Sequence, residues 1–345
     1  MRRAGALVAA LTAVGFLVGC GSSSTTTAAP ATSSPAAVET TPADPTTIRI
    51  ASLKGPTTMG LVGLMQDAEA GTAAEDYQVE VYGTPDEVVP LVVQGNVDIA
   101  LVPANLAAVL YARTLTDDGA QVQVAAINTL GMLEVVEAGE TVGSIEDLRG
   151  RTIYSTGKGA SPEFVLDFLL ARNGIDPDTD VTVEFKSEAT EVTALLASEP
   201  GAIGVLPQPY VTIVKSQNPD VRTALSLAEE WEEVAPESTM VTGVVIVRTA
   251  FATEHPEAFA QFLTDYEAST AFTNEHPEEA APLIVAAGIV PAAPIAEAAI
   301  PACHITFIAG AEMKGDLGGY LQVLFDAEPA SVGGSLPGDD FYHGG

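Results

Sequence analysis

The chain has 345 residues, of which 46 are acidic and 14 are basic, giving a formal net charge of −32. Such an acidic surface repels phosphate backbones, so the composition excludes nucleic acid as a partner. The length is too great for one small core and suits two lobes of about 150 residues each.

The N-terminal segment carries signals for export and anchoring. Two arginines precede an apolar stretch, residues 4–18, which is too short for a convincing membrane span and typical of a signal peptide. The stretch ends in Leu17-Val18-Gly19-Cys20, which resembles the lipobox of bacterial lipoproteins, whose cysteine is acylated and becomes the mature first residue. We therefore predict a signal peptide over residues 1–19, lipidation of Cys20 and an extracytoplasmic, membrane-anchored protein. The alternative is an ordinary signal peptide with an incidental cysteine.

Residues 20–47 are predicted to form a flexible, lipid-anchored linker. From Gly21 the segment is almost entirely Ser, Thr, Ala and Pro, a composition that buries too little apolar surface to order itself. Removal of the leader would leave 12 basic residues against 46 acidic ones, a formal charge of −34.

The next segment alternates strand-like and helix-like runs, which is the pattern of βαβ units. The expected strands are 48–52, 77–82, 97–102 and 122–127, and the expected helices are 59–70, 85–94 and 106–113. This order predicts a mostly parallel sheet.

A second α/β unit follows residues 128–143. Its expected strands are 151–155, 181–185 and 202–206, and its expected helices are 145–148, 162–172, 191–197 and 210–217. A strand over 244–247 then leads into a helix-rich segment that reaches about residue 325, which we expect to complete the first lobe.

Two of the four histidines and the second cysteine are assigned structural roles, and His304 and His343 are isolated in the sequence. His255-Pro256-Glu257 and His276-Pro277-Glu278 place proline at the first position of a helix and glutamate in its first turn. Cys303 lies in an apolar run and is expected to be a small buried side chain. We therefore expect neither a metal nor a cofactor.

The two α/β units match at a constant offset of 104 residues. Lys54-Gly55 falls on Lys158-Gly159, Thr57 falls on Ser161, and residues 97–103 fall on residues 201–207. Ligands of open α/β sheets bind beyond the carboxyl ends of strands, where such turns lead into helix N-termini. Two facing turns would therefore line a cleft, unless the match reflects only the shared βαβ pattern.

The loops after the second matched strands would add one amide from each lobe, Asn105 and Gln208, although capping of the following helix explains Asn105 equally well. The predicted ligand-binding residues are Leu53, Lys54, Gly55, Thr57, Thr58, Pro103, Asn105, Asn128, Thr156, Lys158, Gly159, Ser161, Gln208 and Tyr210.

From residue 48 to about 325 the chain resembles type II extracytoplasmic solute-binding proteins, in the branch that serves nitrate, sulfonate and thiamine-precursor ABC importers. The resemblance rests on the lipobox and on four further segments, which are 53–57, 95–100, 148–153 and 173–177.

The resemblance implies an α/β, two-lobed Venus-flytrap fold with hinge crossings near 128–136 and 240–247. It divides the chain into lobe 1 (48–127 plus 248–330), lobe 2 (128–247) and a C-terminal tail (331–345). It also implies a monomer without catalytic activity that delivers a small solute to an ABC permease. We expect this solute to be anionic, because Lys54, Lys158 and two helix N-termini would supply positive potential at the cleft of an otherwise acidic protein. The alternative is a neutral or cationic solute, with both lysines exposed to solvent. Pyrimidine-binding members use aromatic stacking, which the single Trp231 makes less favourable, although Tyr154 and Tyr210 could serve.

An enzyme on the same fold is the alternative. It would need an acid, base or nucleophile within reach of the substrate, and the loops named above contain no His, Cys or pair of carboxylates.

Overall fold

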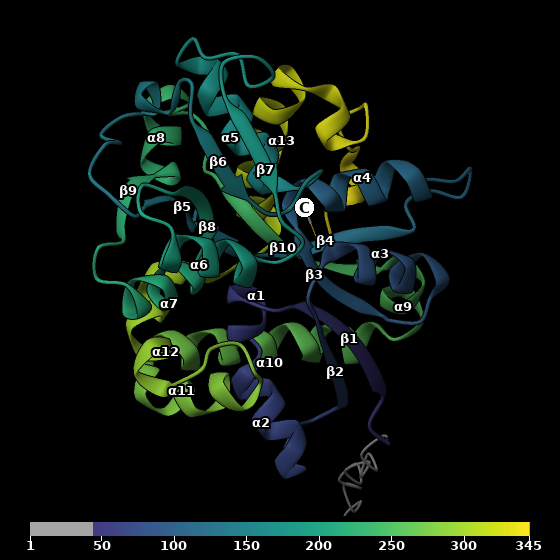
Figure 1. Ribbon diagram of the computed structural model, residues 1–345. Helices are drawn as coiled ribbons and strands as arrows, with labels where there is room; N and C mark the ends of the chain where they lie inside the picture. The colour runs from purple at the N-terminus through teal and green to yellow at the C-terminus, as the bar shows by residue number, and fades with distance from the viewer. Residues whose placement is uncertain (1–43, 345) are drawn as a thin grey trace, which may run out of the picture. The chain divides into compact units, whose positions relative to one another are not determined.

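The computed structural model describes residues 44–344. The predicted signal peptide, most of the predicted linker and Cys20 lie outside these residues. The strands between residues 44 and 344 form two sheets, each flanked by helices (Figure 1). We call the six-stranded sheet with its helices lobe 1, and the five-stranded sheet with its helices lobe 2. No helix in this part of the chain is long and apolar enough to cross a membrane.

The sheet of lobe 1 is mixed and has the strand order β11-β4-β10-β3-β1-β2. Its strands are β1 (Thr47–Leu53), β2 (Asp76–Tyr82), β3 (Ile99–Pro103), β4 (Val122–Leu130), β10 (Val241–Arg248) and β11 (Ile305–Ile308). β1 pairs with β2 and β3 in parallel, whereas β10 pairs with β3 and β4, and β11 with β4, in antiparallel. β10 is buried almost throughout, as expected for a central strand of mostly β-branched residues.

The sheet of lobe 2 repeats this arrangement in the order β7-β6-β8-β5-β9. Its strands are β5 (Leu133–Glu137), β6 (Thr152–Ser155), β7 (Thr182–Phe185), β8 (Ile203–Pro207) and β9 (Arg222–Ser226). β6 pairs in parallel with β7 and β8, and β5 pairs in antiparallel with β8 and β9. The expected strands of the first unit, β1 to β4, thus all run in the same direction, as predicted, whereas β10 and β11 in lobe 1 and β5 in lobe 2 run against their neighbours and make both sheets mixed.

The helices cover both sheets. Those that accompany lobe 1 are α1 (Pro56–Met59), α2 (Val62–Ala70), α3 (Pro85–Gln94), α4 (Ala104–Thr114), α9 (Thr249–Glu254), α10 (Pro256–Glu275), α11 (Pro277–Ala286), α12 (Ala293–Ala299) and the 3₁₀ turn η2 (Ile300–Cys303). Those that accompany lobe 2 are the 3₁₀ turn η1 (Ile145–Leu148), α5 (Ser161–Arg172), α6 (Ala189–Ser198), α7 (Tyr210–Gln217) and α8 (Leu227–Val234).

Local sequence signals set several of these helix ends. α3 begins with a capping box of Thr84 and Glu87 and ends at Gly95, whose left-handed backbone favours glycine. Pro256 and Pro277 occupy the first positions of α10 and α11, as the sequence predicts.

The last helix, α13 (Gly310–Ala327), joins the two lobes. It packs against β4, β10 and α4 of lobe 1 and against α5 of lobe 2, beside which it lies in Figure 1. Tyr320 of α13 contacts Trp231 of α8, which in turn contacts Phe168 of α5. Trp231 is therefore a core residue, and its indole NH donates to the Ser238 carbonyl over 3.1 Å.

The C-terminal tail is folded onto lobe 1. It contains the 3₁₀ turns η3 (Pro329–Val332) and η4 (Asp339–Phe341). Phe341 is fully buried with its ring edge-on to Tyr111, whose hydroxyl donates to Asp340 over 2.7 Å. The tail thus extends the core of lobe 1.

The chain crosses between the sheets at two places. β4 ends at Leu130 and β5 begins at Leu133, while residues 235–240 lead from α8 to β10. The predicted lobe boundaries remain predictions. In the structure, strands β4 and β10 extend over residues 128–130 and 241–247 and pair in the sheet of lobe 1, although the prediction placed these residues in lobe 2.

The strand register supports the internal repeat and refines it. Pro103 and Pro207, 104 residues apart, occupy matching positions opposite Gly243 and Leu133. Ile50 pairs with Ile99, but Ile153 pairs with Ile203, so β1 and β6 differ by 103 residues. The turns that follow these strands also differ in length, two residues before α1 against five before α5. The expected equivalence of the two Lys-Gly turns is therefore wrong in detail.

Candidate functional site

The β1–α1 turn brings five predicted residues to the edge of lobe 1. The hydroxyls of Thr57 and Thr58 each donate to the Leu53 carbonyl over 2.7 Å, so both residues close the turn. Gly55 is buried with φ of 142°, a backbone conformation that favours glycine. Lys54 is exposed, and its ammonium has no ion pair or hydrogen bond among residues 44–344. Lys54 is thus the residue of this turn that is free to meet a ligand.

Three other predicted residues, Asn105, Gly159 and Ser161, meet in a junction with Ser331 beside α13. The Asn105 amide donates to the Ser331 carbonyl over 3.0 Å and to the Gly159 carbonyl over 3.4 Å, and Asn105 accepts from Ser161 over 3.2 Å. Asn105 lies on α4 and does not cap it, while Gly159 lies in the β6–α5 turn and Ser161 is the first residue of α5. Asn105 therefore ties lobe 1 to lobe 2, and its amide is already occupied by protein atoms.

Asn128 belongs to a buried polar cluster at the carboxyl end of β4. Its Nδ2, the Tyr266 hydroxyl and the Thr270 hydroxyl have no hydrogen-bond partner among the described residues. Burial raises the pKa of Tyr266, while Thr270 and Asn128 lower it in part, so the three groups face one another. An ideal Cβ on Gly243 would lie 2.5 Å from Asn128 Oδ1, so only glycine fits there. A buried water suits such a cluster.

Of the two predicted residues at the β8–α7 loop, Gln208 has a structural role. Gln208 Oε1 accepts from the Thr212 backbone NH over 3.2 Å and from its hydroxyl over 2.9 Å, so Gln208 caps α7. Tyr210 is buried, and its hydroxyl has no hydrogen bond within the described part of the chain. Burial, followed by the charge of Glu188, raises the pKa of Tyr210 to about 12, so its hydroxyl stays protonated at neutral pH.

A pocket of about 550 Å³, which we call the inter-lobe pocket, lies between α6 and α7 of lobe 2 and the segment of lobe 1 around the end of α11. Lys54 and Tyr210 are the predicted residues that line it. The full lining is Lys54, Thr190, Thr193, Ala194, Tyr210, Ile213, Gln217, Val285, Gly288, Ile289, Val290 and Pro291. The helix-borne residues and residues 285–291 had no motif in the sequence that could mark them.

The remaining predicted residues have more peripheral positions. Lys158 is exposed, with its ammonium 5.9 Å from the centre of the Phe185 ring. Thr156 lies in the same β6–α5 turn, and Pro103 and Leu53 end strands of lobe 1. None of these four lines the inter-lobe pocket.

The crossings between the lobes are closely packed. An ideal Cβ on Gly131 would lie 2.6 Å from Ala228 Cβ and 2.9 Å from Met240 Cε, so the two crossings touch where only glycine fits. His304 has φ of 46°, and its Nδ1 contacts the Gly131 carbonyl. Because a carbonyl only accepts, this nitrogen carries the proton. His304, which the sequence left without a role, thus packs at the first crossing.

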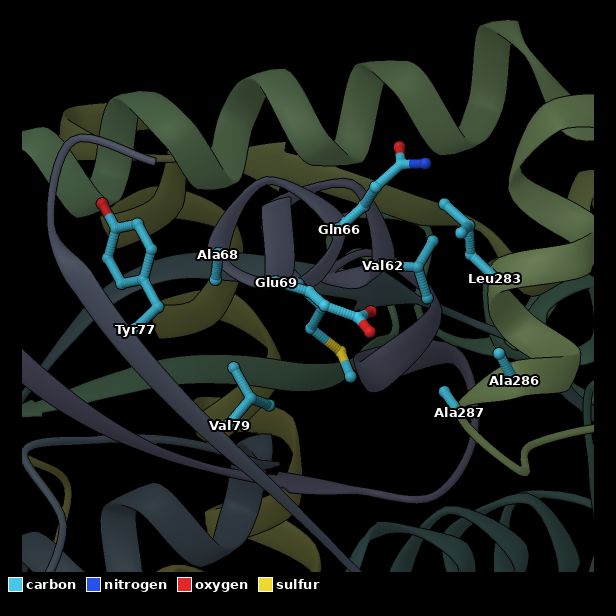
Figure 2. Close-up of a pocket in the computed structure, with 10 residues that line it drawn as sticks. Val62, Gln66, Ala68, Glu69, Tyr77, Val79, Leu283, Ala286 and Ala287 are labelled. Carbon is cyan, nitrogen blue, oxygen red and sulfur yellow. The ribbon is translucent and has the colours of Figure 1, made fainter. Parts of the chain in front are cut away.

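A further groove lies on the outer face of lobe 1. Its volume is about 410 Å³. Figure 2 shows its lining residues, which come from α2, β2 and α11. None of the predicted ligand-binding residues lines it. Residues 44–344 also contain no group of three or more His, Cys, Asp or Glu side chains that could hold a metal ion.

Two sheets of matching strand order, joined by two crossings, define the two-lobed type II periplasmic-binding-protein fold. The sequence model of the family described as NMT1/THI5 like matches residues 73–280, more than half of the chain. The chain therefore belongs to the NMT1/THI5-like family. No curated protein sequence matches the chain.

Solved structures share the fold at low sequence identity. An ABC transporter protein from Parabacteroides distasonis is 21% identical with a TM-score of 0.70, over 86% of this chain and 99% of that one. The alkanesulfonate-binding protein SsuA from Xanthomonas axonopodis pv. citri, bound to MOPS, is 14% identical with a TM-score of 0.66, over 86% and 96%. The periplasmic nitrate-binding protein NrtA from Synechocystis PCC 6803 is 14% identical with a TM-score of 0.54, over 70% and 66%.

Proposed function

We propose that this protein is the solute-binding component of an ABC importer, which captures a small, anionic solute between its lobes and delivers it to the permease. The observation that carries the proposal is the inter-lobe pocket, which lies between two lobes joined by two crossings. Membership of the NMT1/THI5-like family supports it, as do neighbours described as ABC transporter, alkanesulfonate-binding and nitrate-binding proteins.

Binding in such a pocket couples to domain closure. A ligand that contacts α6 and α7 on one side and residues 285–291 on the other stabilises the arrangement in which both sides are close together. The Asn105 junction adds inter-lobe hydrogen bonds to the same arrangement. The permease would then distinguish the loaded protein by its closed shape.

A binding role fits the pocket better than catalysis. The described residues that line it include no His, Cys, Asp or Glu, and its titratable side chains are Lys54 and Tyr210, of which Tyr210 keeps its proton at neutral pH. Cys303 is fully buried, and burial raises the pKa of its thiol, which keeps it unreactive. We therefore propose that the protein is not an enzyme.

Small-angle scattering tests the proposed closure. Solute retained by protein purified from its native source would first be identified by native mass spectrometry, then removed and added back. We expect the radius of gyration to fall by roughly an ångström or more on addition, as in hinge closure. A scattering profile that stays unchanged at saturating solute would contradict the proposed mechanism.

The proposed membrane anchor predicts the behaviour of a Cys20 variant. Cys20→Ala removes the acyl acceptor, so we expect the protein in the medium or as an uncleaved precursor rather than as a mature membrane-bound form. Fractionation and mass spectrometry of the N-terminus would show this. Cys303→Ala serves as the control and should leave the protein on the membrane. Acyl chains on a Cys20→Ala protein would refute the anchor.

A further inference from the structure

The lobes meet in a polar junction at the α4–α5 side of their interface. It consists of the Asn105 amide, the Gly159 carbonyl, the Ser161 hydroxyl and the Ser331 carbonyl, which together we call the latch. Asn105 and the tail residue Ser331 belong to lobe 1, and Gly159 and Ser161 belong to lobe 2. Asn105, Ser161 and Ser331 are buried, so their hydrogen bonds are shielded from water. The latch therefore ties the lobes together with protein atoms alone.

The C-terminal tail fixes the orientation of the Asn105 amide. Nδ2 donates to the Ser331 carbonyl over 3.0 Å, which uses one of its two hydrogens. Ser331 is held in turn by its hydroxyl, which donates to the Leu324 carbonyl of α13 over 3.3 Å. The second Nδ2 hydrogen and Oδ1 are then left for lobe 2, where they meet the Gly159 carbonyl over 3.4 Å and the Ser161 hydroxyl over 3.2 Å.

The side of the latch that lies in lobe 2 is also ordered by local contacts. Gly159 has φ of 77°, a left-handed conformation that favours glycine, and its backbone NH donates to the Glu163 carboxylate in the first turn of α5. The Ala160 backbone NH donates to the Gly157 carbonyl over 2.9 Å. Because these contacts lie within lobe 2, the turn needs little further ordering when it meets Asn105.

Apolar contacts hold the same helix of lobe 2 further along its length. Phe168 follows Ser161 by about two turns of α5. Its ring lies 4.8 Å from the Trp231 ring, which lies 5.3 Å from the ring of Tyr320 on α13. Because α13 also packs against β4 and β10 of lobe 1, lobe 1 holds α5 both at its start and at its middle.

The latch and the inter-lobe pocket are built from different elements. The pocket lies between α6, α7 and the segment around the end of α11, and none of the four latch residues is among the described residues that line it. A solute in the pocket would therefore leave the latch in place. Two separate sets of contacts stabilise the closed lobes, and the latch is the set that needs no solute.

We propose that the latch keeps the lobes mainly closed whether or not a solute is bound. The proposal goes beyond the proposed function, because it concerns the equilibrium between open and closed lobes rather than transport. It gives the C-terminal tail a role, since the Ser331 carbonyl orients the amide that reaches lobe 2. A solute that binds the closed lobes would then bind more weakly wherever loss of the latch lowers the closed fraction.

Small-angle scattering of the full-length protein, freed of solute, tests the latch. Asn105→Asp keeps the shape of the side chain but replaces the donor that faces the Ser331 and Gly159 carbonyls with an acceptor. We expect its radius of gyration at pH 7 to rise by roughly an ångström or more, the scale of domain opening. Ser161→Ala removes one hydrogen bond and should lower the ratio of closed to open protein by about twofold to tenfold.

Hydrogen exchange followed by mass spectrometry separates loss of the latch from local damage to lobe 1. Asn105→Asp should speed exchange by about tenfold around residue 105 and also across the interface, in residues 157–163 of lobe 2. Ser331→Ala is the matched control, because Asn105 uses the carbonyl of Ser331 and not its hydroxyl. The scattering and exchange of Ser331→Ala should equal those of the unchanged protein.

Three outcomes would overturn the proposal. These are unchanged scattering and exchange in both Asn105→Asp and Ser161→Ala, faster exchange confined to lobe 1, or an expansion of Ser331→Ala as large as that of Ser161→Ala. Should Asn105→Asp lose its circular dichroism and fail to fold, the exchange of residues 157–163 in Ser161→Ala decides. A protein that expands when the latch is lost but never becomes more compact with its solute would retain the latch and refute the proposed function.

Discussion

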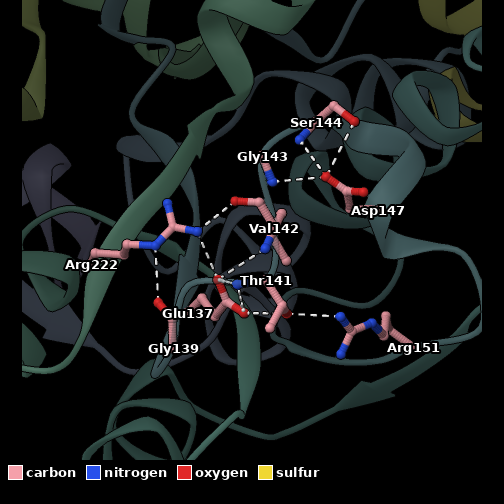
Figure 3. A network of polar contacts seen from close by, with 9 residues as sticks. All are labelled: Glu137, Gly139, Thr141, Val142, Gly143, Ser144, Asp147, Arg151 and Arg222. Atoms are coloured by element: carbon pink, nitrogen blue, oxygen red, sulfur yellow. Dashed lines mark hydrogen bonds and ion pairs between the residues drawn. The ribbon is translucent and has the colours of Figure 1, made fainter.

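Replacing Glu137 with glutamine should lower the free energy of unfolding at pH 7 by about 2–4 kcal/mol. Glu137 is fully buried at the end of β5, where Figure 3 shows its contacts. Its carboxylate accepts from the Thr141 backbone NH over 2.8 Å, from the Val142 backbone NH over 3.1 Å and from Arg222 over 2.8 Å. Glutamine has the same size but no charge. Its amide NH₂ group would also place hydrogen-bond donors against the donors from Thr141, Val142 and Arg222.

The effect of Glu137 should depend on pH. Burial raises the pKa of Glu137, but the hydrogen bonds from Thr141 and Val142 and the charge of Arg222 together bring it below the ordinary value of 4.5. A carboxyl with a lowered pKa stabilises the fold above its unfolded pKa and loses this contribution as the pH falls through its folded pKa. The difference between the two proteins should therefore be largest above about pH 5 and shrink in acid.

Denaturant unfolding at several pH values measures this difference. Glu140→Gln is the matched control, because Glu140 is exposed in the same loop and has no ion pair among residues 44–344. A Glu137→Gln protein as stable as Glu140→Gln at pH 7 would show that the buried network contributes nothing to stability.

Replacing Glu134 with glutamine should have the opposite effect and raise the stability at pH 8 by about 1–3 kcal/mol. Glu134 lies three residues before Glu137 on the same strand, and its Oε2 is buried without a partner among the described residues. Burial and the charge of Glu229 raise the pKa of Glu134 to about 7, while Lys215 lowers it in part.

The sign of the Glu134 effect follows from the raised pKa. The folded state holds this proton more tightly than the unfolded state, whose carboxyl titrates near 4.5. The contribution of Glu134 to the free energy of unfolding is therefore most favourable below about pH 4.5 and declines as the pH rises. Above about pH 7 the carboxyl is ionised in both states, and its destabilising effect is complete. Glutamine should remove this decline. A Glu134→Gln protein that loses as much stability between pH 5 and 8 as the unchanged protein would contradict the prediction.

Periodicity and turn chemistry predicted most of the secondary structure. The expected strand 77–82 and helices 85–94 and 210–217 match β2, α3 and α7 closely. β5 was predicted only as part of one hinge strand near 128–136, because two residues separate it from β4 and the apolar stretch hides the change of sheet. β11 has four residues and lies in a region that otherwise has a helical pattern. The antiparallel direction of β10 was also beyond the sequence, since an antiparallel return strand has the same local pattern as a parallel one.

The candidate site, too, could be predicted from the sequence only in part. The sequence pointed to polar residues at strand ends, and the structure places Lys54 and Tyr210 in the lining of the inter-lobe pocket. It also shows that Asn105 and Gln208 make hydrogen bonds within the protein. No sequence pattern could separate these cases, because an amide that binds a ligand and an amide that binds a carbonyl have the same local sequence.

By itself the sequence determined the acidic character, the two α/β units and their repeat, because composition, periodicity and turn residues are local properties. Only the tertiary structure decided that the sheets are mixed, that α13 joins the lobes and that residues 285–291 cover a pocket between α6 and α7. These features depend on which surfaces of distant segments pack together. That choice is made by the burial of shared apolar surface rather than by any one segment.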